Sequence, residues 1–523
     1  MRKLLFFLFV YIFPFALLAD ELPTEVKRPA IDTYRHTSLP PYIAKPEGIN
    51  GNYRKMTISP KALPDPLLRY RVNIFATEKE TGNAYPLYVA ALKEFHNRLQ
   101  QAMTAMYQSE TYRKLDPDKE GYQQEIEKLQ FKAFPLYSYW GMRDHPEITA
   151  EEEAGSYQSL NEVYRLMEKA SKKTYYDWGD TYEYKGIATN LGHLQEARTL
   201  TRYLVDKANW EIRNGKYDDA TRTICVGLAH ADHILESRPP SFLVGMLVGT
   251  ALESAMHEQL FQLAAQPGAP NLYPALMQLT KTSRPWLDAM QSETLFLLPK
   301  HSDNAFWESQ DSLSPDQAEN ILDELCTMLF IAFDGEFIKD TRSMTMTAAA
   351  LTSYLPAKQR LLQKGFSEEA IEALTTYQIV APFVFEELKR AYDLMLVEAS
   401  MPVGETHTSF QFDEYVMDRH RNPRSPSDFM VAMLMPATLA AQSAFHRQQQ
   451  TLDLLKIVEA ICYSAAVHGK LPASLDEITE LAVPKICPIT AKPYGYHSSG
   501  RTAVIDYNFG HRGGECRIDI TVE

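Results

Sequence analysis

The sequence lacks the short motifs that mark the common enzyme classes. It contains no nucleophile elbow, no P-loop, no dinucleotide-binding fingerprint and no HExxH zinc motif. His257-Glu258 begins like the zinc motif, but Phe261 stands where the second histidine is required. Carboxylates are plentiful, yet no spacing singles out an acid and a base as in a glycosidase. No catalytic residue and no cofactor is therefore predicted.

Cysteine is scarce, with five in 523 residues, and no two of them have CxxC spacing. This excludes a zinc ribbon and a thioredoxin-type site. Cys487 leads into the first strand expected near the C-terminus and Cys516 precedes the last, and strand ends in a small sheet can approach to the roughly 5.5 Å Cα separation of a disulfide. We expect a Cys487–Cys516 bond, with Cys462 a buried thiol. A Cys462–Cys487 bond and no bond at all are the alternatives.

Long hydrophobic runs are also missing. The N-terminal run from Leu4 to Leu18 follows two basic residues and ends at Ala19-Asp20, which is the pattern of a signal peptide over 1–19. The run is short for a membrane-spanning helix. Phe242 to Leu263 is fully apolar over only about 15 residues, so it predicts a helix buried on all sides. We expect export to the periplasm or cell envelope, without a stable membrane span after cleavage.

Positive charge is in deficit. The chain has 53 Lys and Arg against 67 Asp and Glu, a formal net charge of −14 at pH 7. Such a chain repels phosphate backbones, so nucleic acid is not an expected partner. The length predicts two or three domains, and a hydrophobic content of 45% is ample for a large core.

Helical periodicity is abundant and predicts a mainly α fold. A bundle or irregular α-solenoid is expected over 71–400, without sheet from residue 80 onward. Gly215 to Ala220 separates two facing apolar stripes, as in one tetratricopeptide-like hairpin, but no 34-residue repeat follows. Gly245 and Gly249 are expected to admit a neighbouring backbone. The principal helices are predicted over Leu87–Tyr107, Tyr122–Phe134, Ala150–Lys169, 191–265 and Ser314–Phe333, with later helices interrupted near Pro356 and Pro382.

One aromatic and acidic segment is a weak candidate for a binding surface. It holds Tyr176, Asp177, Trp178 and Asp180. Aromatic rings beside acids can bind sugars or peptides, whereas the simpler interpretation is a capped loop lying on the core. The sequence leaves both open.

Two histidines are the best metal candidates. His230 and His233 lie near Asp232 and Glu236. At about 100° per residue, both histidines point away from the apolar stripe that contains Ile224. They are therefore expected on a solvated polar face, and no metal site is predicted.

The C-terminal stretch predicts a small α+β module over 428–523. A long helix from Met430 to His468 should lie on a short antiparallel sheet with strands at Tyr494–His497, Ala503–Phe509 and Arg517–Val522. Ser474 and Glu477 form a capping-box pattern, which predicts a short helix to about Leu481.

This module resembles the soluble part of type II secretion major pseudopilins. The resemblance is carried by His468-Gly469-Lys470-Leu471-Pro472, by Pro488-x-Thr490-x-Lys492-Pro493-Tyr494-x-Tyr496 and by Tyr507-Asn508-Phe509-Gly510, and it covers about 70 of the 523 residues. The N-terminal processing signature of that family is absent. The last loop also lacks the Asp residues that often bind calcium there, so no calcium site is expected.

The chain from about 70 to 463 resembles a broad group of uncharacterised exported bacterial proteins. They share an early Asn-Ala-Tyr motif, here Asn83-Ala84-Tyr85, and a helix-Gly-x-Tyr-x-x-Ala-helix centre. The resulting organisation is a signal peptide over 1–19, an extended Pro-rich arm over 20–70, the helical domain, a linker over 401–427 and the C-terminal module. The leading hypothesis is a non-enzymatic exported protein that binds other proteins or envelope components. The alternative is an exported hydrolase with an unrecognised site around Asp177, Trp178 and Asp180.

Overall fold

A computed structural model describes residues 46, 49, 51–116, 122–134, 149–179, 191–238, 243–279, 287–289, 313–331, 338–400, 426–508 and 515–523. The expected signal peptide at 1–19, most of the expected linker at 401–427, and Asp180 lie outside these residues. Within the described ranges, no helix combines the length and the hydropathy needed to cross a membrane.

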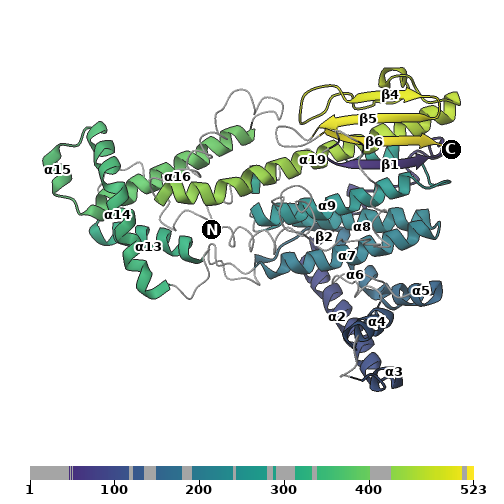
Figure 1. The fold of residues 1–523 in the computed structure, drawn as a ribbon, viewed down its shortest axis with the longest axis horizontal. Helices are drawn as coiled ribbons and strands as arrows, with labels where there is room; N and C mark the ends of the chain where they lie inside the picture. The colour runs from purple at the N-terminus through teal and green to yellow at the C-terminus, as the bar shows by residue number, and fades with distance from the viewer. Residues whose placement is uncertain are drawn as a thin grey trace.

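The body of the molecule is a stack of helices close to the predicted ones. Figure 1 shows α7, α8 and α9 side by side beneath the sheet, with α2 to α6 below them. The expected helix over 150–169 is broken at Leu160, which caps both halves. The bounds are α2 Tyr85–Gln108, α3 Glu110–Arg113, α4 Tyr122–Ala133, α5 Ala150–Ser159, α6 Asn161–Ser171, α7 Gly192–Arg213, α8 Tyr217–Leu235, α9 Leu243–Ala264 and α10 Tyr273–Leu276.

The α7–α8 turn forms where the sequence predicts it. Gly215 has a φ of 68°, in the left-handed region that favours glycine. The Lys216 N–H donates to the Glu211 carbonyl at 2.8 Å, which satisfies one carbonyl at the end of α7. The two helices therefore pack as a hairpin, and α8 goes on to pack against α9.

Glycines permit the close approach of α8 and α9. A Cβ at Gly249 would lie 2.7 Å from Leu235 Cγ and 3.3 Å from the Leu235 backbone nitrogen. A Cβ at Gly227 would lie 2.3 Å from Met256 Sδ. Gly249 has the role that the sequence predicts, whereas Gly227 was not anticipated because it lies within the apolar pattern of α8.

Gly249→Ala is expected to lower the free energy of unfolding by about 1–3 kcal/mol, because the new methyl group overlaps a buried leucine next to backbone. Urea unfolding measures this change. Gly155→Ala in α5 is the matched control, since a Cβ there meets nothing within 4 Å. The control should gain up to about 1 kcal/mol from helix propensity. Equal effects at the two positions would contradict the packing argument.

Two expectations for the region 80–400 are wrong. Strands β2 (Glu80–Asn83) and β3 (Lys173–Tyr175) form a two-stranded parallel sheet within a region predicted to have none. The strands join because Asn83 extends the pairing through its side chain, accepting from Asp177 N at 2.8 Å and donating to Asp177 O at 2.7 Å. These bonds link segments about 90 residues apart, which no local pattern reveals.

The second wrong expectation is that Pro356 and Pro382 interrupt their helices. Pro356 lies inside α14 (Ile338–Gln363) and Pro382 lies inside α16 (Thr376–Ser400), and both helices continue through them. With α13 (Pro315–Ile331) and the short α15 (Glu368–Glu372), they form a lobe at the far end of α19 from the sheet (Figure 1). The lobe packs around buried side chains such as Ile379 and Phe385. Tertiary contacts therefore override the helix-breaking tendency of proline.

The C-terminal sheet is mixed rather than antiparallel. Strands β4 (Gly495–Ser499), β5 (Thr502–Asn508) and β6 (Glu515–Val522) pair antiparallel as expected. However, β1 (Tyr53–Ile58) pairs parallel with β6, which gives the order β1-β6-β5-β4. The expected arm over 20–70 thus supplies a strand. It does so because Met56 and Ile58, two residues apart, both face the core.

Helix α19 (Pro426–His468) lies along the sheet and reaches the helical lobe (Figure 1). It starts four residues before the predicted Met430, and Gly469 ends it with a φ of 67°, as predicted. The short helix expected to reach Leu481 is only the 3-10 turn Leu475–Glu477. The Glu477 carboxylate accepts instead from Ala473 N at 2.7 Å, so no reciprocal capping box forms there.

The expected Cys487–Cys516 disulfide is not formed in this structure. Both residues are buried free thiols, and so is Cys462. Cys487 Sγ accepts a hydrogen bond from Gln450 Nε2 at 3.0 Å, whereas Cys516 Sγ accepts from Asn52 N at 3.1 Å. Each sulfur is therefore held by its own polar partner. The expectation of a buried Cys462 thiol is confirmed.

Candidate functional site

The predicted binding surface is largely buried. Tyr176 and Trp178 are each only 3% exposed, so the surface interpretation is wrong for both rings. Asp177 is partly exposed, and its Oδ1 accepts from Gly179 N at 2.9 Å. Two backbone bonds hold the segment against Arg238: Trp178 N donates to Arg238 O at 2.9 Å, and Arg238 N donates to Tyr176 O at 2.8 Å. The simpler interpretation, a segment lying on the core, fits these rings.

The two histidines are not on a solvated face. His230 is 1% exposed and His233 is 8% exposed. The prediction was wrong because helical phase relative to Ile224 does not say what packs on the other side of α8. Tyr88 of α2 lies against both rings, Thr201 of α7 bonds His230, and the Lys173 carbonyl of β3 bonds His233. Asp232 is partly exposed and Glu236 is exposed. Across the described part of the chain, no group of three metal-binding side chains comes together.

Both ring nitrogens of His233 are engaged. Nε2 lies 2.9 Å from the Lys173 carbonyl, which can only accept, so Nε2 carries the proton. Nδ1 lies 2.9 Å from Tyr88 Oη and accepts from it. His233 thereby connects α2 to β3 through α8. His230 Nδ1 is 3.2 Å from Thr201 Oγ1 of α7, which fixes the second imidazole.

Aromatic contacts complete a cluster that we call the histidine–tyrosine cluster: Tyr85, Tyr88, Tyr176, Trp178, His193, His230 and His233. The Tyr88 and His230 ring centroids are 4.3 Å apart, and the Trp178 and His193 rings stack at the same distance with 25° between their planes. Tyr85 meets Tyr176 edge to face at 5.4 Å. His193 and Tyr88 were missed at the sequence level, because contacts between four separate segments leave no spacing signal.

The hollow at the cluster is small. Tyr88, Tyr176, His193 and His230 border a hollow of about 10 Å³, which is room for about one water molecule. Burial lowers the pKa of His193 and His233 to about 4 and that of His230 to about 3. Burial also raises the pKa of the Tyr88 hydroxyl. At neutral pH the cluster is therefore an uncharged, hydrogen-bonded joint between helices.

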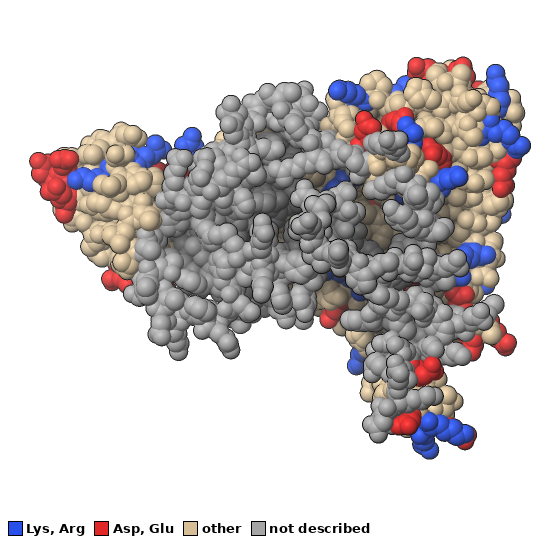
Figure 2. Space-filling model, viewed as in Figure 1, with Lys and Arg blue, Asp and Glu red and all other residues tan. Residues whose placement is uncertain are grey.

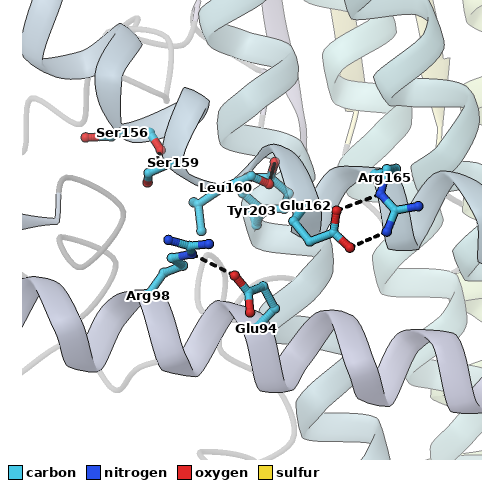
Figure 3. Close-up of polar contacts among 8 residues, drawn as sticks. All are labelled: Glu94, Arg98, Ser156, Ser159, Leu160, Glu162, Arg165 and Tyr203. Atoms are coloured by element: carbon cyan, nitrogen blue, oxygen red, sulfur yellow. Dashed lines mark hydrogen bonds and ion pairs between the residues drawn. The ribbon is translucent and has the colours of Figure 1, made fainter.

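Charged side chains of α2 and α6 form ion pairs, and each pair lies within one helix (Figure 3). Arg98 Nε lies 2.7 Å from Glu94 Oε1, and Arg165 Nε lies 2.6 Å from Glu162 Oε2. The Arg165 bond lowers the pKa of Glu162, the opposite of what a general acid requires. Tyr203 Oη donates to the Leu160 carbonyl at 3.3 Å and so ties α7 to the α5–α6 break. The arrangement supports the packing of helices and offers no matched acid and base.

Comparisons with protein-family models, with curated proteins and with solved structures find no match for this chain.

Proposed function

We propose that this is an exported helical protein that acts by binding another protein of the cell envelope, without catalysis. The observation that carries the proposal is a row of exposed leucines on α14. Leu351 is 73% exposed, Leu355 is 68% exposed and Leu362 is 38% exposed. Leucines scattered singly on a surface need no explanation, whereas three exposed leucines along one face of a helix suggest an interaction site.

Two further observations support a binding role. The histidine–tyrosine cluster encloses too little space for a substrate. Its hydrogen-bonded imidazole and phenol side chains therefore serve the packing of helices. The expected signal peptide supports an envelope location, where the likenesses to a tetratricopeptide hairpin and to a pseudopilin module would both suit protein contacts. The leucine row lies in the lobe at the far end of α19, away from the sheet (Figure 1).

Site-specific photocrosslinking in cells tests this function. A crosslinking amino acid at Leu351 should capture one major envelope protein, whereas the same group at the exposed Gln363, about 120° around α14, should capture little of it. Leu351→Ser combined with Leu355→Ser should reduce capture from a probe at Leu362 at least about tenfold, because two apolar contacts are lost. The melting temperature should stay within about 2 °C, since both side chains face solvent. Equal capture from 351 and 363 would overturn the proposed function.

A further inference from the structure

The leucine row has the spacing of a coiled-coil seam. Leu351, Leu355, Lys358 and Leu362 follow at intervals of four, three and four residues. At about 100° per residue, these four positions fall within roughly 60° of one another on α14. Alternating intervals of three and four are what a facing helix requires, because its side chains enter between successive seam residues. The occupant that fits this surface is therefore a helix.

Lys358 interrupts the apolar seam with a positive charge. Its side chain is 23% exposed, and its Nζ lies 3.9 Å from a carboxylate oxygen of Glu372, whose side chain is 69% exposed. A long ion pair to an exposed carboxylate holds an ammonium group weakly. A lysine in a seam selects partners, because a facing helix has to present a group that compensates the charge.

A second copy of α14 does not provide that group. In a parallel pair, Lys358 would face Lys358, and like charges in contact are unfavourable. In an antiparallel pair centred on the seam, Leu351 would face Leu362 and Lys358 would face Leu355, so two ammonium groups would be buried against leucine. Neither arrangement of two copies satisfies the seam.

The charges beside the seam also favour a different protein, rather than a second copy of this chain, as the binding partner. Glu368, Glu369 and Glu372 of α15 make an acidic tip beyond Leu362, seen as the red patch at the left end of Figure 2. A partner helix that places an acid against Lys358 and a basic residue near this tip would be complementary along its length.

We propose that the α14 seam binds an amphipathic helix of a different protein, with an Asp or Glu opposite Lys358. The proposal rests on the proposed binding function and specifies the chemistry of the partner.

Two synthetic helical peptides test it. Both carry the same leucine seam and a basic C-terminal turn, and they differ only in Glu or Lys at the position that faces Lys358. Fluorescence anisotropy with the full chain should show at least about tenfold tighter binding of the Glu peptide, the discrimination expected of a charge placed in a seam. Lys358→Glu should reverse that preference. Lys389→Glu on α16, an exposed lysine paired with Asp393, should leave it unchanged.

The outcomes separate this inference from the function on which it rests. Equal binding of both peptides, unaffected by Lys358→Glu, would overturn the seam proposal even if crosslinks from Leu351 still capture an envelope protein. A dimer in sedimentation analysis that Leu355→Ser dissociates would assign the seam to a second copy and overturn it as well. So would an intramolecular crosslink from Leu351 to another segment of the same chain.

Discussion

Lys207→Met is expected to lower the free energy of unfolding by about 3–5 kcal/mol, because it leaves a buried carboxylate without its counter-ion. Lys207 and Glu211 form an ion pair one turn apart on α7, with side chains only 12% and 3% exposed. Glu211 Oε2 also accepts from Thr223 Oγ1 of α8 at 2.7 Å, and the Lys207 ammonium lies 4.7 Å from the centre of the Tyr164 ring. The pair therefore joins α6, α7 and α8.

Urea unfolding of four variants measures this effect. Lys207→Met combined with Glu211→Leu removes both charges and should recover most of the loss, since an apolar pair of similar size needs no compensation. Lys389→Met on α16 is the matched control, because that lysine pairs with Asp393 at the same spacing while both side chains are about half exposed. It should cost less than about 1 kcal/mol. Glu211→Gln should fall between the extremes, because it keeps a hydrogen-bonding group without the charge. If Lys207→Met costs no more than Lys389→Met, the buried pair is not a support of the fold.

Glu459→Gln is expected to change the pH dependence of stability relative to the wild type, because it removes a buried carboxyl group whose pKa is raised. Burial raises the pKa of Asp206 and Glu459 to about 7 and that of Asp453 to about 6. The folded state thus holds up to three protons between about pH 5 and 6 that the unfolded chain does not. These carboxyl groups favour the folded state as pH falls, and that contribution is lost as pH rises through their folded pKa values.

Four histidines are buried among the described residues, and three of them, His193, His230 and His233, have lowered pKa values that act in the opposite direction. Their folded pKa values, about 4, 3 and 4, lie below the ordinary 6.5, so the unfolded chain binds up to three protons that the folded state does not. Their contribution is present above pH 6.5 and is lost as pH falls towards 4. The two sets of groups therefore act against each other in the wild type.

Removing one carboxyl group changes this pH dependence. Relative to the wild type, Glu459→Gln should lose about 1.4 kcal/mol of unfolding free energy for each pH unit of acidification between about pH 7 and pH 5, which is the linkage of one proton. Urea unfolding at several pH values measures the slope. Glu110→Gln, whose parent side chain is 81% exposed, should follow the wild type. A Glu459→Gln profile parallel to that of the wild type would show that Glu459 does not hold this proton in the folded state.

The predictions that succeeded depend on neighbouring residues. The helices predicted to begin at Ala150 and Ser314 form, and both starts are capped locally: Thr149 and Glu152 exchange reciprocal bonds, and Ser314 and Gln317 exchange bonds at 2.9 and 3.2 Å. The all-round burial of α9 followed from its composition, and 16 of its 22 residues are buried. Hydrophobic pattern and capping chemistry are contained within one element, so the sequence reveals them.

The failures at the candidate site involve partners distant in sequence. His230 and His233 were expected to face solvent. Helical phase gives the direction in which a side chain points but not which elements pack there, and other helices cover that side. The sequence left Tyr176 and Trp178 open between a binding surface and a loop on the core, because the flanking β-bridge between Asp177 and Arg238 joins segments about 60 residues apart. The histidine–tyrosine cluster draws on four segments, so no single window of sequence contained it.

The pairing of β1 with β6 has a consequence for how the chain reaches its fold. Tyr53 lies beside Arg517, a sequence separation of 464 residues. Contacts of such high order form slowly, because a very long loop has to close first. During synthesis, β1 has no partner until β6 has been made, so the sheet can only assemble late. A fragment that begins at residue 428 would likewise contain β6 with one edge uncovered, which is a hazard for aggregation. The arm and the C-terminal strands should therefore be kept together whenever this module is expressed.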